Sequence, residues 1–404
     1  MKTRHILFLL LAVLTAATSC VYDYNPQIEG EGGYLIVEGN IVIGDMCNVR
    51  LDYSWSLVDT TQGDERWRIL SSSKMYIEDS SGGRYENRYG NGGYEPYMDS
   101  YYYGRGSYGL FDLQDADPSL EYRLVIENEK GTYASVWQKS LDAGEIDDLS
   151  YKISDDGTTM SVRVSAHSDD PAGSYYRWSV RETWEYHADV YAIYTYLAYS
   201  REEGEVVYLE EKDRTYRCWT TSNRPEIMTA STGSLTEDRL VDHELYTLNY
   251  HDERVSVIYS PEVVQMRIPA DAYKYWEMMD RNSRDVGGLF SPEPSEYRGN
   301  VVNLDKPEEM VLGYVGVMSV SRKKMFVDNS TLRFYRSNRA PVPPPDTLNN
   351  LEQYALAYRQ GMLPATDVYD EETGRFLGYE WWPVSCVDCR RRGGTLTRPD
   401  DWPD

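Results

Sequence analysis

One stretch in which apolar and polar side chains alternate constrains the fold of this chain more than any other feature. Within Ser174–Tyr186 (SYYRWSVRETWEY), every second residue from Tyr176 onward is apolar except Glu182. A period of two is that of a strand with one buried face. The stretch therefore predicts a central, half-buried β-strand.

Shorter stretches with strand-like composition recur along the chain, and turn residues such as glycine, serine and asparagine separate them. They lie at 34–44, 48–54, 74–79, 121–127, 133–137, 160–164, 216–219, 227–230, 255–259, 263–268, 311–317 and 324–327. Their spacing predicts a mainly β protein, with an Ig-like β-sandwich over 34–143. A polar, glycine-containing boundary at 141–148 separates it from a larger β-rich domain over 147–404.

The second domain is also expected to contain about two helices. After Pro269 the apolar period becomes helical, with Ala272, Trp276 and Met279 on one face of a helix over 271–284. A second helix is predicted over 348–360, between a capping Asp346 or Thr347 and Gly361.

The first twenty residues have the organisation of an export signal. Lys2 and Arg4 precede an unbroken apolar run over 6–14, and small, weakly polar residues over 15–19 lead to Cys20. The run is too short to cross a hydrocarbon core of ~30 Å, which takes about 20 apolar residues, but it fits the apolar region of a signal peptide. Small residues that end at a cysteine resemble the lipobox of bacterial lipoproteins, in which that cysteine is acylated.

We therefore predict a signal peptide over 1–19, lipidation at Cys20 and a lipid-anchored tether over 20–33. The expected location is the outer membrane, on either its periplasmic or its cell-surface face. An ordinary signal peptide cut at Ala17 or Ser19 is the alternative.

Composition limits the partners of the chain. The formal net charge is −25, and removal of the leader, with Lys2 and Arg4, makes it more negative by two. Such a charge excludes nucleic acid and anionic lipid surfaces as expected partners, because both select for basic patches. Attachment to a membrane then has to come from acyl chains, of which two or more anchor stably.

Four cysteines follow the lipidation site, namely Cys47, Cys218, Cys386 and Cys389. Export to an oxidising compartment permits disulfides, and the sequence leaves all three pairings open. The last two cysteines have C-x-x-C spacing, but no second ligand pair for zinc accompanies them. We predict disulfide candidates and no metal or cofactor.

The chain contains 37 tyrosines and only 6 phenylalanines, and many of the tyrosines lie in a glycine-rich insert over 85–108. The candidates for ligand contact there are Tyr94, Tyr97, Tyr101, Tyr102 and Tyr103. Tyrosines on an adaptable backbone are typical of binding loops. A long hairpin whose tyrosines cover one another explains the insert equally well.

No catalytic residue is predicted. The five histidines are scattered, and neither a zinc-protease motif nor a nucleophile elbow is present. Glu182 with Arg177 or Arg181 could form an acid–base pair, although alternating charges on a strand are usually cross-strand ion pairs. The 66 acidic residues leave a glycosidase-like carboxylate pair open.

The chain resembles the Bacteroidota outer-membrane lipoproteins grouped as domain of unknown function 4249. The segments that carry the resemblance are Leu35–Gly39, Tyr175–Trp178, Glu182–Tyr186, Tyr297–Asn300, Leu312–Tyr314 and the tail from Cys386 to Trp402. The chain departs from the pattern in the tyrosine-rich insert, in a segment around 191–214 and in the proline spacer 341–345. Similar proteins tend to have another cysteine at that spacer, so the resemblance leaves Cys47 or Cys218 as the partner in a disulfide.

Members of that family are often encoded beside TonB-dependent receptors, so the resemblance implies a partner role at an outer-membrane transporter. It brings no activity and no catalytic residue. Our leading hypothesis is a non-enzymatic outer-membrane lipoprotein that captures a ligand for such a transporter. The alternatives are a glycan-active surface enzyme and a structural or adhesive surface protein.

Overall fold

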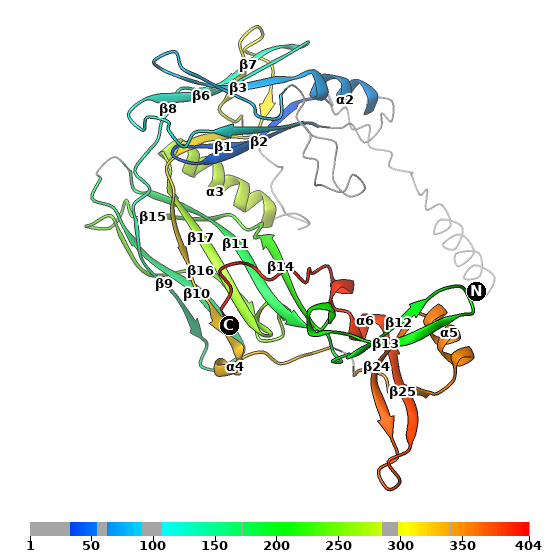
Figure 1. Ribbon diagram of the computed structural model, residues 1–404. Coiled ribbons are helices and arrows are strands. Elements are labelled where there is room, and N and C mark those ends of the chain that lie inside the picture. The colour runs from blue at the N-terminus through cyan, green and yellow to red at the C-terminus, as the bar shows by residue number, and fades with distance from the viewer. Residues whose placement is uncertain are drawn as a thin grey trace, which may run out of the picture.

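The computed structural model describes residues 33–54, 63–90, 107–170, 173–284, 298–339 and 341–403. Strands make up 47% and helices 14% of the chain, so the predicted mainly β class is confirmed. Two β-sandwiches and a smaller lobe are visible in Figure 1. Among the helices of the described ranges, none combines the length and the apolar character needed to cross a membrane.

The first sandwich consists of two sheets around one apolar core. The strands of one sheet are, in order, β19 (Val311–Leu312), β1 (Leu35–Val42), β2 (Met46–Tyr53) and β5 (Ser107–Asp112), with β20 (Val315–Met318) also on β1. Those of the other are β18 (Val301–Asn303), β7 (Gly131–Ser135), β6 (Glu121–Asn128), β3 (Lys74–Asp79) and β4 (Arg84–Glu86), with β8 (Gln138–Lys139) on β6. Helix α2 (Gly63–Ser72) adds Ile69 and Leu70 to the core.

Three strands of this sandwich come from the distant segment 301–318. β19 and β20 pair in parallel with β1, and Val301, Val311, Val315 and Val317 join the core. The chain thus leaves the first sandwich, builds most of the second and returns. A sequence pattern cannot show this return, because it reports periodicity within a segment and not which distant segments pair.

The second sandwich contains the strand predicted first from the sequence. Its smaller sheet is β16 (Arg239–Asn249), β10 (Thr159–His167) and β9 (Glu145–Ile153). Its larger sheet is β14 (Arg217–Asn223), β11 (Tyr175–His187), β17 (Ile258–Arg267) and β21 (Ser321–Lys324), with β15 (Met228–Ser231) on β11 and β22 (Val327–Asp328) on β17. The 3-10 turn η2 (Glu253–Val255) precedes β17, and α4 (Asn329–Leu332) follows β22.

Strand β11 has the predicted alternation. Tyr176, Trp178, Val180 and Tyr186 are buried on one side, and Glu182 is buried with them. The predicted strands at 255–259 and 263–268 are one continuous strand, β17. It begins at Ile258, because residues 253–255 form the turn η2.

Both predicted helices are present. Helix α3 (Ala270–Arg284) follows β17, and its exposed side has ion pairs one turn apart, Glu277 with Arg281 and Asp280 with Arg284. Helix α5 (Leu351–Arg359) begins at Asn350, whose side chain caps the helix by accepting from the amide of Gln353.

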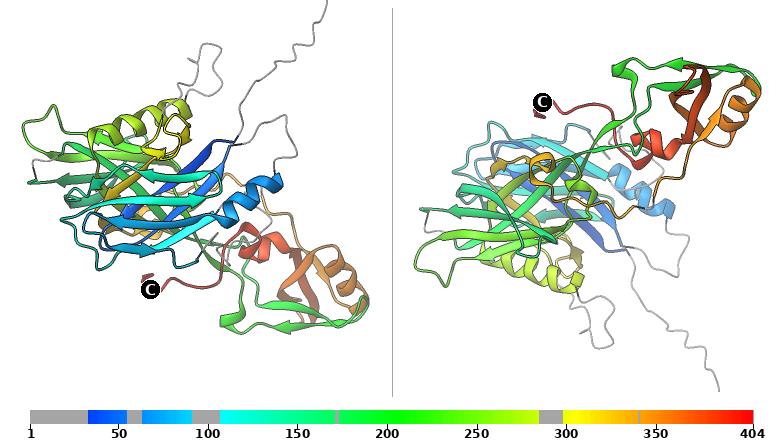
Figure 2. Two further views of the ribbon diagram at one scale, coloured as in Figure 1. Left: turned by 90° about the horizontal axis from the view of Figure 1, so that it is seen from above. Right: turned by 90° about the horizontal axis from the view of Figure 1, so that it is seen from below.

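The small lobe projects beyond the two sandwiches in both views of Figure 2. Its elements are β12 (Tyr194–Ala198), β13 (Gly204–Tyr208), η1 (Glu211–Asp213), β23 (Asp346–Leu348), α5, β24 (Met362–Tyr369), β25 (Phe376–Pro383), α6 (Val384–Val387) and η3 (Cys389–Arg392). Tyr196, Tyr354 and Trp381 form its buried centre, and the ring of Tyr354 stacks on that of Trp381 at 5.4 Å.

Candidate ligand-binding site

Several residues singled out from the sequence lie outside the described ranges. They are Cys20 and the insert tyrosines Tyr94, Tyr97, Tyr101, Tyr102 and Tyr103. The other four cysteines lie within the described ranges.

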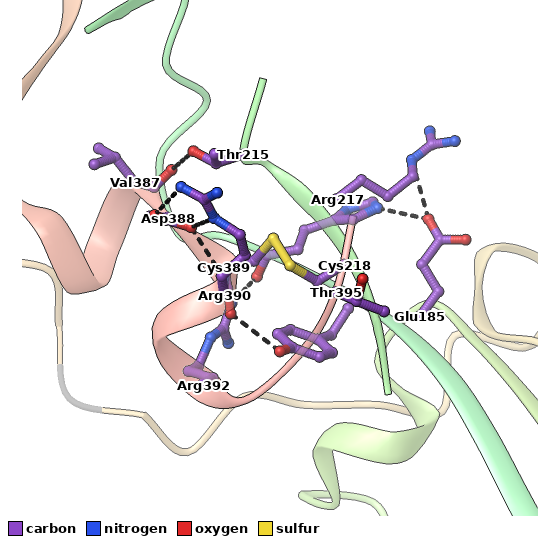
Figure 3. Close-up of a disulfide and its surroundings, with 12 residues drawn as sticks. Glu185, Thr215, Arg217, Cys218, Val387, Asp388, Cys389, Arg390, Arg392 and Thr395 are labelled. Atoms are coloured by element: carbon purple, nitrogen blue, oxygen red, sulfur yellow. Dashed lines mark hydrogen bonds and ion pairs between the residues drawn. A yellow bond between two sulfur atoms is a disulfide. The ribbon is translucent and has the colours of Figure 1, made fainter. Parts of the chain in front are cut away.

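The structure joins Cys218 on β14 to Cys389 at the start of η3, with 5.8 Å between their Cα atoms (Figure 3). Cys386 and Cys47 are reduced and buried. The C-x-x-C pair therefore does not bridge within itself, and of the two partners that the resemblance left open the structure uses Cys218. Burial raises the pKa of the Cys47 thiol to about 11.

The disulfide is part of a larger attachment of the C-terminal tail to the second sandwich. The Thr215 hydroxyl donates to the Val387 carbonyl at 2.9 Å (Figure 3). Trp219 forms a β-bridge with Thr395. Further along, the indole of Trp402 donates to the buried carboxylate of Glu185 at 2.9 Å. The tail is thus held at both ends of its length.

Glu185 has an electrostatic role in this attachment. Burial alone would raise its pKa, but hydrogen bonds from His187 and Trp402 and the nearby charge of Arg217 hold the pKa below its ordinary value. Glu185 is therefore ionised at neutral pH and ties the tail to β11 and β14.

Glu182 is not free to act as an acid or a base. Arg224 and Arg254 each donate to one of its two carboxylate oxygens at 2.8 Å, and the Tyr259 hydroxyl donates to it as well. It contacts neither Arg177 nor Arg181 in the way considered from the sequence. Its partners come from β17 and the turns beside β14 and β17, and the group forms a buried ion network.

A second polar cluster lies at the edge of the smaller sheet. One oxygen or nitrogen atom from each of Glu145, Asp147 and His167 falls within 4.8 Å of the others, a spacing that could hold a metal ion. However, Arg239 already pairs with Asp147 at 3.1 Å, and Lys323 donates to its carbonyl at 2.6 Å. Arg239 thus forms an ion pair with the Asp147 carboxylate, whereas the hydrogen bond from Lys323 goes to the main chain.

A cavity of about 560 Å³ lies where the two sandwiches meet, in the size range of small-molecule sites. Figure 1 shows α3 between the strands of the first sandwich and β11. The described lining residues are Ile36, Val37, Glu38, Gly39 and Asn40 of β1, Arg177 of β11, Tyr275, Trp276, Met278, Met279 and Asn282 of α3, Leu312 of β19, and Gly313 and Tyr314 between β19 and β20.

Gly313 allows one wall of the cavity to approach β1 closely. β1 pairs with β19 at Leu35 and Ile36 and with β20 from Gly39 onward. The segment that joins β19 to β20, which contains Gly313, therefore turns away from β1 between the two pairings. Gly313 has a φ of +98°, and a Cβ there would overlap the carbonyl oxygen of Val37. Only glycine satisfies both conditions without strain.

Arg177 is the charged group at the centre of the lining. Its guanidinium stacks on the ring of Trp276, with Cζ 3.8 Å from the ring centroid. Among the described residues, its Nε is buried without a hydrogen-bond partner, and its Nη1 donates to the sulfur of Met266 at 3.7 Å. Among the described residues no carboxylate lies within ion-pair distance of Arg177.

Burial lowers the pKa of Arg177 to about 10, so it is still protonated at neutral pH. The one carboxylate among the lining residues, Glu38, is 60% exposed and pairs with Arg50 at 3.4 Å. The amide oxygen of Asn40 is buried and has no partner within the described ranges. The cavity therefore offers one uncompensated positive charge, one free acceptor and apolar walls.

The comparisons with known proteins place this chain. The family model described as Domain of unknown function (DUF4249) matches residues 21–324. The chain belongs to the DUF4249 family. A search of curated proteins found no match.

The cavity lies entirely within the DUF4249 match. Three of the segments that carry the resemblance, Leu35–Gly39, Tyr175–Trp178 and Leu312–Tyr314, contribute to its lining. Sequence reasoning quoted Arg177 and Trp276 but did not bring them together, because they lie on different elements. Arg177 lies in the resemblance segment Tyr175–Trp178, whereas Trp276 lies in none of these segments, so no sequence signal linked the two.

The part of the small lobe beyond residue 324 lies outside the DUF4249 match. Its sheet presents a row of aromatic rings in edge contact, in which Tyr369 meets Phe376, Phe376 meets Tyr379, and Tyr379 meets Tyr194. Tyr194 in turn contacts Tyr208, which is 60% exposed. Nothing in the sequence pattern predicted this row.

Proposed function

We propose that this DUF4249 protein is a non-enzymatic lipoprotein of the outer membrane that captures a small ligand for a TonB-dependent nutrient transporter. The observation that carries the ligand-capturing part is the cavity with its uncompensated Arg177. Arg177 as a residue is half-buried, but its Nε is shielded from water and has no partner among the described residues. Such a poorly solvated, unpaired charge costs free energy in the empty protein, and a ligand of opposite charge would reduce that cost.

Attachment to the membrane is argued from the leader. The apolar run and the small residues before Cys20 support acylation of that cysteine, and the segment 20–33 supports a short flexible tether. A net charge of −25 opposes binding to anionic lipid by charge alone, so acyl chains have to supply the attachment.

The non-enzymatic character is argued from the chemistry of the cavity. Acid–base catalysis needs a group that can exchange a proton near neutral pH. Glu38, the carboxylate that lines the cavity, is exposed and paired with Arg50, whereas Glu182 and Glu185 are engaged elsewhere in ion networks. This lining is suited to binding rather than to turnover.

The membrane arm of the proposal is tested by replacing Cys20. Wild-type protein and the Cys20→Ser variant are expressed with labelled palmitate, and the envelope fraction is collected. We expect label and sedimentation in the wild type and neither in the variant, whereas Cys386→Ser, which changes a buried cysteine, keeps both. Sedimentation of Cys20→Ser with the envelope would contradict lipid anchoring.

The transporter arm is tested by co-purification. Tagged, lipidated protein is extracted from envelopes in a mild detergent, and its partners are identified by mass spectrometry. We expect a β-barrel receptor to elute with it in a fixed ratio. A solitary protein under these conditions would contradict the transporter role, whatever the outcome of the lipidation test.

A further inference from the structure

Arg177 determines what chemistry the cavity can accept. The charge lies on β11, and Trp276 of α3 stacks on its guanidinium. Its Nε faces no acceptor in the described part of the chain. A guanidinium presents parallel N–H donors in a planar fork that matches a carboxylate. The geometry therefore favours an anionic, planar acceptor.

The surroundings limit the ligand to a single negative charge. Arg177 is the one arginine or lysine among the described lining residues, and Glu38 at the same cavity disfavours a second negative charge. The remaining walls come from Trp276, Met279 and Leu312, which offer apolar and aromatic surface. A ligand that fills the space needs an apolar body next to its anionic group.

We propose that the cavity binds a small amphipathic monocarboxylate, with its carboxylate on Arg177 and its apolar or aromatic body along α3. This inference rests on the proposed ligand-capturing function and deepens it by naming the class of ligand. The acceptor oxygen of Asn40 gives a place for one N–H or O–H donor on the same ligand.

The overall charge of the protein makes a preference for an anionic ligand informative. With a net charge of −25, the field of the whole molecule repels anions. A preference for an acid over its neutral amide can then arise only from a local positive group. Among the lining residues that group is Arg177.

The probes are 2-naphthylacetate, its neutral amide and 2-(2-naphthyl)ethylamine, which share one aromatic body. Binding to the mature full chain with Cys20→Ser is measured by calorimetry, because detergent micelles around the lipidated form would absorb the probes. We expect the acid to bind at least about tenfold more tightly than the amide, since hydrogen bonds to charged groups contribute that much. The amine should bind most weakly.

Variants of two arginines on β11 then test whether Arg177 causes the preference for the acid. Arg177→Gln should abolish the preference for the acid, and Arg177→Lys should keep part of it, because the charge remains but the stacked fork is lost. Arg181→Gln changes an exposed guanidinium on the same side of β11 and should leave the preference unchanged. Circular dichroism and urea midpoints check that each variant is folded.

Equal binding of acid and amide by the unsubstituted cavity would overturn the inference, and this comparison needs no variant. Binding of none of the three probes would overturn it as well, as would a preference for the acid that survives in folded Arg177→Gln. Because receptor co-purification is scored separately, a failure here leaves the transporter role standing, and the reverse also holds.

Discussion

The disulfide between Cys218 and Cys389 gives the most quantitative prediction. It closes a loop across 171 residues. In the chain-entropy relation, such a loop removes about 5 kcal/mol of conformational freedom from the denatured chain at 25 °C. The double variant Cys218→Ala/Cys389→Ala should therefore lower the free energy of unfolding of the second sandwich by up to about 5 kcal/mol.

The assay is urea unfolding followed by tryptophan fluorescence, with the reduced wild type as a second sample. At a slope of about 3 kcal/mol per molar urea, the midpoint should fall by about 1.7 M. Reduced wild type should match the double variant. Cys386→Ala, which truncates a buried free cysteine three residues away, is the control. Its urea midpoint with the disulfide intact should differ from that of the wild type only by the small amount expected for one buried truncation.

The pairing itself is checked by mass spectrometry. Trypsin cuts after Arg375 and Arg390, so one peptide contains both Cys386 and Cys389. In Cys386→Ala the linked peptide can contain only Cys389, and it should join the peptide that begins at Cys218. A full cross-link in Cys386→Ala together with an unchanged midpoint in the double variant would refute the entropy argument. Loss of the cross-link in Cys386→Ala would refute the pairing.

Three further predictions follow from the buried charges and the buried thiol. Glu182→Ala removes the buried carboxylate that Arg224 and Arg254 share, leaves Arg224, whose side chain is 4% exposed, paired with the half-exposed Glu226, and should cost up to about 3–5 kcal/mol in urea unfolding, whereas Arg181→Ala should cost less than about 0.5 kcal/mol. The lowered pKa of Glu185 gives stability that is present above its ordinary value of 4.5 and is lost as the pH falls through the lowered value. Glu185→Gln should therefore be less stable than the wild type at neutral pH but lose less stability between about pH 5 and pH 2; parallel pH curves of the two urea midpoints would contradict this. The Cys47 thiol, with its pKa raised to about 11 by burial, should resist a disulfide reagent at pH 8 in folded Cys386→Ala and react once urea is added.

The sequence was informative where one strand face is buried and the other is not. β11 was predicted almost to the residue, because its alternation reports a single buried face. β3 was predicted from its strand-like composition before a turn, and both of its faces are buried at Met75, Tyr76 and Ile77. β24 and β25 were missed because a bulge breaks the alternation, so that Phe376 and Tyr379 contact each other. Aromatic rings on an uncovered sheet likewise give no apolar stripe.

The candidate site could be predicted only in pieces. The alternation predicted that Arg177 lies on the polar side of β11, and the structure confirms this. It could not show that α3 covers this side and places Trp276 on the guanidinium, because the covering element is far away in the chain. A polar residue in a half-buried strand looks the same from sequence whether water or a helix lies over it.

The return of the chain through 301–318 links the two halves of the site. Asn300 donates to and accepts from the backbone of Val315 at 2.7 and 2.8 Å, which fixes the strands on either side of Gly313. The same segment continues into β21, which pairs with β17 in the second sandwich. One continuous piece of chain therefore determines the distance between the β1 wall of the cavity and the β11 wall that holds Arg177. A ligand that contacts both walls would therefore meet them at a separation that this segment determines.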